Sequence, residues 1–540
     1  MKYIKNLFLL FAFLASNVYA TDTYNPANSQ LTIPSVVLGN TVYKDVVITI
    51  GPILTVGGSN LDSKYPAKPS TTPDTYDPYT NQLTIPNVNA YGFVYYDVVI
   101  NVGVVLSVGS SSPVTPPVVT VPKPPSFTSM GKFDMSALSE WSGTLTFEAL
   151  AVGDVNMDGY DDILVGAFAL DNTFAGINQK TKSVLFVFDP VANTFKPDTQ
   201  FLSVVSKTIF PRQAVIADFD GDGRNDIYIG DHGLDQNPRC GAPNQIVLNK
   251  ASGMISADTP FKNLNDFSHG VVYADFNNDK KVDLLVLNSN NLCNKAGHIT
   301  NSYFVSGQDF SNMNVKVEGL NLSLNTGTDF LVGVQDNKTM VLGGEKSMTI
   351  FEDSGNQDYR IKQVITPPQS FSTKYNCEYA NTNCSTPYTS IIFADLDNDG
   401  QKEIIASITY SDWLKSGGWA GQFFQVLKKN GTQWKDVSDQ FFPVQNDPNT
   451  KPEWCYAISV ADFNGDGTND IVCSSRKTSP HTIFWTNKNG QFTPWDTTAL
   501  SLITQGYHHR VLKTPSGSIL TALRWKTDDS RTLELVGWKF

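Results

Sequence analysis

Five segments of the chain carry oxygen-bearing side chains at one repeated spacing. Each follows the pattern D-x-[DN]-x-D-G-x-x-[DE], except that the third has lysine in place of the glycine. A hard cation such as Ca²⁺ takes roughly six to eight oxygen ligands. Side chains at positions 1, 3, 5 and 9 and the main-chain carbonyl of position 7 can supply them if the backbone curls around the ion. Glycine at position 6 permits that turn.

The five segments, called loops 1 to 5 below, predict up to five calcium sites. The expected ligands, in chain order, are Asp154, Asn156, Asp158, Tyr160 and Asp162 in loop 1; Asp218, Asp220, Asp222, Arg224 and Asp226 in loop 2; Asp275, Asn277, Asp279, Lys281 and Asp283 in loop 3; Asp395, Asp397, Asp399, Gln401 and Glu403 in loop 4; and Asp462, Asn464, Asp466, Thr468 and Asp470 in loop 5. The residue at position 7 contributes only its carbonyl oxygen.

Neither an ordinary turn nor an EF-hand explains the five loops as well as a calcium site between strands does. An ordinary turn rich in Asp, Asn and Gly would account for one loop, but not for five at a common period. An EF-hand needs a bidentate glutamate at position 12, and that position holds Val165, Ile229, Val286, Ala406 or Cys473. The runs that flank the loops are also strand-like.

Loop 3 departs from the pattern at the turn. Lys280 replaces the glycine and Lys281 follows it. Two positive charges and a hindered turn should weaken cation binding, so the Asp275 site is predicted to be the weakest of the five or absent.

The chain is acidic overall, with a formal net charge of −12, and loops 1 to 5 hold 18 of its 52 acidic residues. Much of the acidity is therefore explained by metal ligation. Nothing basic dominates, which argues against nucleic acid as a partner.

The spacing of the loops indicates a repeated β unit. Their first aspartates lie at 154, 218, 275, 395 and 462, so the period is near 60 and one loop is missing around residue 335. The apolar runs 331–334 and 340–344 fit a unit there without an acidic loop, and 510–512 and 519–523 fit a seventh. Apolar and β-branched runs flank the loops, and four strands per unit predict a propeller of seven blades over residues 127–540.

With these motifs in view, segments such as Ala461-Asp462-Phe463-Asn464-Gly465-Asp466-Gly467-Thr468-Asn469-Asp470-Ile471-Val472 resemble the FG-GAP/VCBS repeats of exported bacterial proteins and of the integrin α-like seven-bladed β-propeller. The resemblance covers roughly residues 127–540. It implies calcium loops between the first two strands of a blade, on one face of the disc. It also implies adhesion or ligand binding by loops on the opposite face.

The two ends of the propeller are expected to share one blade. Residues 532–540 read as a third strand of the last blade, and residues 127–141 can supply its outer strand. Such pairing would join the ends of the ring.

The N-terminal part of the chain has a different organisation. Residues 1–20 combine two lysines, a short apolar run and Val18-Tyr19-Ala20, which is typical of a cleaved signal peptide and predicts a secreted or cell-surface protein. Two β repeats follow, at 21–60 and 73–109, with a period of 52 residues, and each reads as a small hairpin-like module. A Pro-rich linker is expected over 110–126.

Six cysteines in an exported chain allow three disulfides in 15 connectivities. Cys377 and Cys384 enclose a short loop and are the best pair. Cys240 and Cys293 follow the second strands of consecutive units and could join them. Cys455 and Cys473 remain by elimination, and two buried free thiols are the alternative there.

The remaining residues leave the ligand open. Trp413 and Trp419 lie in a glycine-containing insertion and could stack on a sugar or anchor a protein partner, or fill the core. No short catalytic motif is present, and no catalytic residue is proposed. The leading hypothesis is an adhesion or recognition module for a surface protein or glycan, monomeric and without a membrane span. The alternatives are a polysaccharide lyase-like enzyme on the same scaffold and a structural surface protein.

Overall fold

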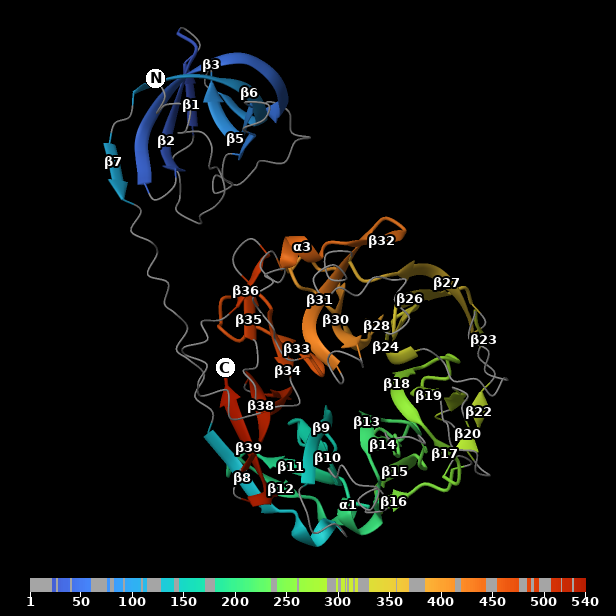
Figure 1. Cartoon of the computed structure of the whole chain (residues 1–540). Helices are drawn as coiled ribbons and strands as arrows, with labels where there is room; N and C mark the ends of the chain where they lie inside the picture. Colours follow the sequence, from blue (N-terminus) through green and yellow to red (C-terminus); the bar gives the residue numbers. More distant parts are fainter. Residues whose placement is uncertain are drawn as a thin grey trace. The chain divides into compact units, whose positions relative to one another are not determined.

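The computed structural model of the chain is nearly all-β (Figure 1). It divides into two compact units, Met1–Lys123 and Pro124–Phe540, which are described separately. No helix in the described part is long and apolar enough to cross a bilayer. The structure describes residues 22–25, 28–38, 41–59, 75–77, 82–90, 93–107, 110–113, 128–139, 145–169, 180–234, 240–259, 262–288, 298–299, 303–305, 307, 310–313, 316–318, 330–355, 357–368, 384–412, 419–442, 454–474, 483–486, 490–494, 507–515, 517–526 and 529–540.

In the first unit the two N-terminal repeats form one sheet. Its order is β1-β2-β3-β6-β5-β4, with β7 beside β3 and a further parallel pair between β1 and β5. The strands are β1 (Asp22–Asn25), β2 (Gln30–Leu38), β3 (Thr41–Ser59), β4 (Thr75–Asp77), β5 (Gln82–Ala90), β6 (Phe93–Ser107) and β7 (Ser110–Pro113). Because β7 belongs to this sheet, the stretch expected to be a linker from residue 110 begins in a strand.

Equivalent residues of the two repeats build a common core. Leu31 and Leu83, Ile33 and Ile85, and Ile48 and Ile100 are pairs 52 residues apart, and all six are buried in one cluster. Separate hairpin-like modules were expected from the sequence. The structure pairs β3 of the first repeat with β6 of the second, because a single hairpin has too little apolar surface to be stable alone.

The second unit contains, among its described residues, seven sheets of four or five strands, named here sheets I to VII. Sheet I has β9 (Leu145–Gly153), β10 (Asp162–Ala169), β11 (Val184–Asp189) and β12 (Thr194–Pro197); sheet II has β13 (Pro211–Ala217), β14 (Asp226–Asp231), β15 (Gln245–Lys250) and β16 (Gly253–Ser256); sheet III has β18 (Ser268–Ala274), β19 (Asp283–Asn288), β21 (Tyr303–Val305) and β22 (Asn312–Met313).

The other four sheets complete the unit. Sheet IV has β23 (Lys316–Val317), β24 (Phe330–Asp336), β25 (Thr339–Gly344), β26 (Met348–Asp353) and β27 (Asp358–Ile365); sheet V has β28 (Cys384–Ser385), β29 (Tyr388–Ala394), β30 (Glu403–Asp412), β31 (Trp419–Asn430) and β32 (Gln433–Asp436); sheet VI has β33 (Ala457–Ala461), β34 (Asp470–Ser474), β35 (Ile483–Thr486) and β36 (Phe492–Pro494); sheet VII has β37 (Tyr507–Thr514), β38 (Gly517–Lys526), β39 (Asp529–Lys539) and β8 (Thr128–Asp134). Outside these sheets lie the two-stranded pair β17 (Asn265–Asp266) and β20 (His298–Ile299) and the helices η2 (Ser136–Leu138), α1 (Thr199–Val204) and α3 (Ser438–Phe441).

The two units that the spacing predicts without an acidic loop are present as strand hairpins. The hairpin β24–β25 occupies the position of the missing acidic loop near residue 335, and β37–β38 occupies the last unit. In sheet VII, β39 pairs with β8 from the start of the unit, with Leu535 opposite Gly131.

Strands are counted from β24 in sheet IV and from β29 in sheet V, leaving out the two-residue strands β23 and β28. Each second strand is buried on both faces because its alternate side chains enter different cores. In β19, Leu284 and Val286 join the cluster shared with sheet II, whereas Leu285 and Leu287 join the cluster shared with sheet IV. Since successive side chains of a strand point to opposite faces, a continuous apolar run is what such a doubly covered strand requires.

Every pair of consecutive sheets shares such a core. The clusters join I with II, II with III, III with IV, IV with V, V with VI, VI with VII, and VII with I. The first strands contact one another in the same order, β9, β13, β18, β24, β29, β33 and β37, and β37 also contacts β9. This packing holds the turns between first and second strands at the same end of each sheet.

Candidate metal centres in the acidic loops

Each acidic loop is the turn between the first two strands of a sheet. Loops 1 to 5 lie in sheets I, II, III, V and VI, and the residue at position 9 begins the second strand in all five. The sequence pattern therefore marks a single structural position, repeated in five sheets.

The aspartate at position 1 organises the turn. In every loop its carboxylate accepts hydrogen bonds from the backbone amides of positions 5 and 6, at 3.0–3.2 Å and 2.8–3.0 Å. The carboxylate at position 5 accepts from the amide of position 7 at 2.8–3.1 Å. These contacts curl the backbone around its own carboxylates.

Left-handed backbone explains the glycine at position 6. There φ is +86° at Gly159, +86° at Gly223, +85° at Gly400 and +86° at Gly467, and loop 3 forces Lys280 to +70°. A side chain is disfavoured in that region because Cβ crowds the backbone. The expected hindrance in loop 3 is thus present as a strained lysine.

The carboxylate at position 9 is buried in every loop. Asp162, Asp226, Asp283, Glu403 and Asp470 are all fully buried. One oxygen of each accepts the backbone amide of position 2, at 2.8–3.0 Å. In loops 1 to 3 the other oxygen accepts a backbone amide of the third strand, from Phe188 or Asn249, or one just after it, from Gly307, and this links the third strand to the loop.

Burial shifts the titration of these carboxyls. Desolvation outweighs the backbone hydrogen bonds and raises the pKa of Asp162 to about 7 and the pKa values of Asp226 and Asp283 to about 6. The pKa of Glu403 is raised for the same reason. A charged group that burial disfavours gains from a bound cation, because the cation replaces the lost solvation.

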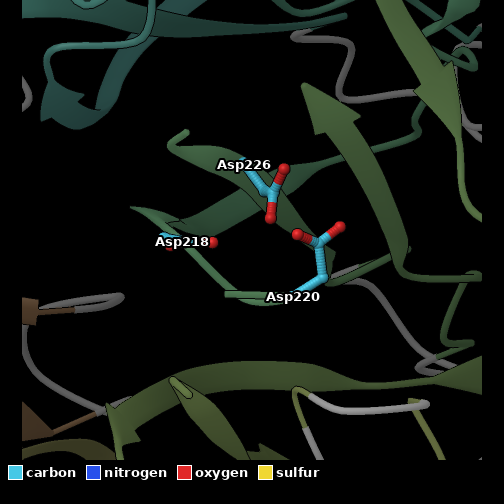
Figure 2. Close-up of side chains that lie close together, drawn as sticks. All are labelled: Asp218, Asp220 and Asp226. Atoms are coloured by element: carbon cyan, nitrogen blue, oxygen red, sulfur yellow. The ribbon is translucent and has the colours of Figure 1, made fainter. Parts of the chain in front are cut away.

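Carboxylates converge most closely in loops 2 and 4. Oxygens of Asp218, Asp220 and Asp226 lie within 4.8 Å of one another, and so do those of Asp395, Asp397 and Asp399. Figure 2 shows the Asp220 and Asp226 carboxylates turned toward each other. A site whose ligands are all oxygen atoms suits a hard divalent cation such as Ca²⁺.

Two residues of these centres escaped sequence reasoning. Lys250 forms ion pairs with Asp220 and Asp222 in loop 2, and Lys428 forms ion pairs with Asp397, Asp399 and Glu403 in loop 4. They lie 24 and 25 residues beyond position 9, on third strands, so no nine-residue pattern could have found them.

Position 8 connects a loop to its neighbouring sheet. The Asn225 side chain of loop 2 donates to the carbonyl of Asp154 in loop 1 at 2.8 Å, and Asn469 of loop 5 donates to the carbonyl of Asp395 in loop 4 at 2.7 Å. In loop 1 the Asp161 carboxylate accepts the amide of Lys513 in β37 at 2.6 Å. The loops therefore help to join consecutive sheets.

Comparison with known families identifies the repeats. A family model described as FG-GAP-like repeat matches residues 218–286, and one described as FG-GAP repeat matches residues 146–176. The chain contains FG-GAP repeats. The first match spans loops 2 and 3 and the second spans loop 1, so these three acidic loops lie within the matched segments.

Solved structures of low similarity also match the chain. The crystal structure of the N-terminal domain of Nup159 matches at 13% identity and a TM-score of 0.38, covering 77% of this chain and 96% of that one. The periplasmic gluconolactonase PpgL of Pseudomonas aeruginosa matches at 10% identity and a TM-score of 0.38, covering 64% and 83%. The α-L-arabinofuranosidase Arb93a of Fusarium graminearum matches at 12% and 0.33, covering 76% and 98%. No curated protein matches the chain. Scores this low carry no functional argument.

The cysteines of the second unit differ from expectation at one pair. Cys455 and Cys473 are buried free thiols, so the disulfide expected between them is not formed. Cys455 donates to the carbonyl of Ala457 at 3.4 Å and Cys473 donates to Gln422 Oε1 at 3.1 Å, and these bonds satisfy both thiols in the core. Cys240 is disulfide-bonded. Its expected partner Cys293, and Cys377 of the other pair, lie outside the described residues, and only the backbone of Cys384 is described.

The aromatic candidates for ligand contact cannot be placed in a site. Trp413 lies outside the described residues, as do residues 1–20. Of Trp419 only the backbone, at the start of β31, is described.

Proposed function

We propose that this protein is an exported, calcium-stabilised seven-bladed β-propeller that recognises a surface protein or a glycan. The observation that carries the proposal is the common hydrogen-bonded geometry of loops 1 to 5, in which oxygen donors converge at one repeated position.

The contacts between sheets support a closed propeller. Each of sheets I to VII shares a core with the next, and sheet VII shares one with sheet I. The pairing of β39 with β8 places both ends of the unit in a single sheet. In this proposal the seven sheets are the blades, and the shared blade closes the ring.

The loops support calcium as the stabilising ion. Position 1 shapes the turn, position 9 supplies a buried carboxylate, and positions 3 and 5 supply further oxygens. Calcium bound there would offset the repulsion among carboxylates and add its binding free energy to folding. Loop 3 would bind most weakly because Lys280 is strained and Lys281 adds positive charge.

Export and recognition are supported by other features. FG-GAP repeats are typical of extracellular proteins, and residues 1–20 have the composition of a cleaved signal peptide. A rigid propeller that carries metal loops at one end of its sheets has the other end available for recognition. In the sequence, residues 413–419 bring two tryptophans into one insertion.

The test is a binding screen of the mature chain, residues 21–540, against glycan and surface-protein arrays, with millimolar Ca²⁺ and with chelator. We expect saturable binding to one ligand class in Ca²⁺, and a parallel loss of binding and of thermal stability in chelator. Product release from a polysaccharide would instead identify an enzyme. Thermal unfolding that is indifferent to chelator would contradict the calcium-stabilised propeller.

A further inference from the structure

Two of the five loops receive a lysine side chain from a distant strand. Lys250, the last residue of β15, contacts Asp220 of loop 2 and lies 3.2 Å from Asp222 Oδ2. Lys428 of β31 contacts Asp397 of loop 4 and lies 2.8 Å from Asp399 Oδ2 and 3.3 Å from Glu403 Oε1. Both ammonium groups therefore contact positions 3 and 5, two of the expected metal ligands.

In loops 1, 3 and 5 a side-chain hydrogen bond, and not a lysine, connects positions 3 and 5. Where position 3 is asparagine, its side-chain amide donates to the position 5 carboxylate, from Asn156 to Asp158 at 2.9 Å, from Asn277 to Asp279 at 3.0 Å and from Asn464 to Asp466 at 3.2 Å. Where position 3 is aspartate, as in loops 2 and 4, it has no hydrogen to donate, and the lysine takes over that role.

Lysine also equalises the charge of the loops. Positions 1, 3, 5 and 9 carry three carboxylates in loops 1, 3 and 5 but four in loops 2 and 4. Adding one ammonium to each four-carboxylate loop leaves three net negative charges at these positions in all five. The aspartate at position 3 and the lysine thus occur together in this chain.

We propose that Lys250 and Lys428 are tethered cations that occupy the four-carboxylate loops in the metal-free protein and compete with the divalent ion for them. The inference rests on the proposed calcium function and adds its regulation. Calcium must displace an ammonium in loops 2 and 4, so their fourth carboxylate does not give tighter binding. In return these two loops keep a counter-charge when calcium is scarce, because the competing cation is covalently attached.

The first test uses the mature chain in chelator and measures thermal unfolding. Lys428→Met should lower the Tm by about 2 °C or more, because four carboxylates lose their counter-charge. The double variant Asp397→Asn/Lys428→Met converts loop 4 to the asparagine type and should restore most of the loss. Lys402→Met is the matched control, since Lys402 is in loop 4 but pairs with Asp336 of β24 at 3.1 Å. An equal loss in the control, or no rescue in the double variant, would overturn the proposal.

The second test measures calcium affinity by chelator-competition titration. Lys428→Met should strengthen one site about tenfold, since a charge-assisted contact no longer has to be broken, and Lys402→Met should leave all sites unchanged. If the wild-type chain binds calcium and Lys428→Met leaves every affinity unchanged, the proposal that lysine competes with calcium is wrong, whereas the proposed calcium function is unaffected. If the wild-type chain binds no calcium, the proposed function fails, and the unfolding test in chelator alone decides whether the lysine replaces the ion.

Discussion

At the residue scale, the strained turn of loop 3 can be relieved. Lys280 has φ +70° at a position where the other loops have glycine. Lys280→Gly should stabilise the metal-free protein by about 1 kcal/mol, because a side chain costs about that much in the left-handed region. It should also strengthen calcium binding by loop 3. Chemical denaturation in chelator measures the first effect and calcium titration the second.

Lys280→Ala separates strain from charge in this experiment. Alanine removes the ammonium but keeps Cβ, so it should give little of the stability gain. If alanine and glycine stabilise the protein equally, backbone strain is not what sets loop 3 apart.

The buried carboxyls at position 9 predict a pH-dependent calcium affinity. The pKa is about 7 for Asp162 and about 6 for Asp226 and Asp283, whereas the ordinary value is 3.8. Because these pKa values are raised, the folded metal-free protein holds protons that the unfolded chain loses, and these groups make it less stable as pH rises from about 4 to about 7. Calcium binds the ionised carboxylate, so the calcium affinity should increase as pH rises over this range.

Calorimetry can follow this proton exchange directly. The affinity of loop 1 should fall about 25-fold between about pH 7.5 and pH 5.5, because the ionised fraction of Asp162 falls by that factor, and calcium binding near pH 7 should release protons. Asp162→Asn should abolish the part that loop 1 contributes to this release. A calcium affinity that stays constant across this range would contradict the assignment of position 9 as a ligand.

The nine-residue pattern was sufficient to predict much of the candidate site. It identified the glycine turn and the abnormal loop, because both depend on residues close in sequence, whereas the burial of the position 9 carboxylate appears only in the structure. Lys250 and Lys428 could not be predicted in this way, since the register between second and third strands brings them to the loop. The free thiols at Cys455 and Cys473 also depend on neighbours, here Gln422 and Ala457, that a count of cysteines cannot reveal.

At the element scale, β18 and β24 approach each other too closely for a side chain at one point. A Cβ added to Gly270 of β18 would lie 2.4 Å from the carbonyl oxygen of Leu331 in β24. Since that atom belongs to the backbone of a packed strand, Gly270→Ala should cost about 1–3 kcal/mol. Chemical denaturation of the variant in calcium measures the cost.

A control for this prediction is Gly355→Ser, at a turn between β26 and β27. The added Cβ there meets nothing within 4 Å, although φ is +98°. It tests backbone strain without a clash between sheets. If Gly270→Ala costs no more than this control, the first strands of sheets III and IV accommodate a methyl group without a clash, and the prediction is wrong.

The elements of the second unit were easier to predict than those of the first. Long apolar runs beside each acidic loop require strands covered on both faces, and the missing loop near residue 335 is replaced by a plain hairpin, β24–β25. In the first unit the 52-residue repeat was visible in the sequence, but the strand with which each repeat pairs was not. Pairing of β3 with β6 across repeats depends on the shared core of Leu31, Leu83 and their neighbours, and a sequence period cannot distinguish it from two separate hairpins.

At the scale of the whole molecule, the last strand joins the beginning of the second unit to its end. β39 lies between β38 and β8, and its Leu533, Leu535 and Val536 are buried in the described structure. Leu533 and Leu535 belong to the same core as Phe147 and Phe186 of sheet I. Removing β39 would therefore expose the core between sheets VII and I and separate β8 from its sheet.

Deletion of residues 531–540 should for this reason destabilise every sheet of the second unit, and not only sheet VII. Each sheet depends on a core on both sides, so an open end at sheet VII leaves sheets VII and I each with one uncovered face. We expect cooperative loss of the calcium-dependent melting transition and rapid proteolysis in loops 1 to 5. Deletion of Phe540 alone, which leaves β39 complete, is the control. If the longer deletion leaves loops 2 and 4 protected and calcium-bound, the sheets fold independently and closure by the terminal strands is not what stabilises the unit.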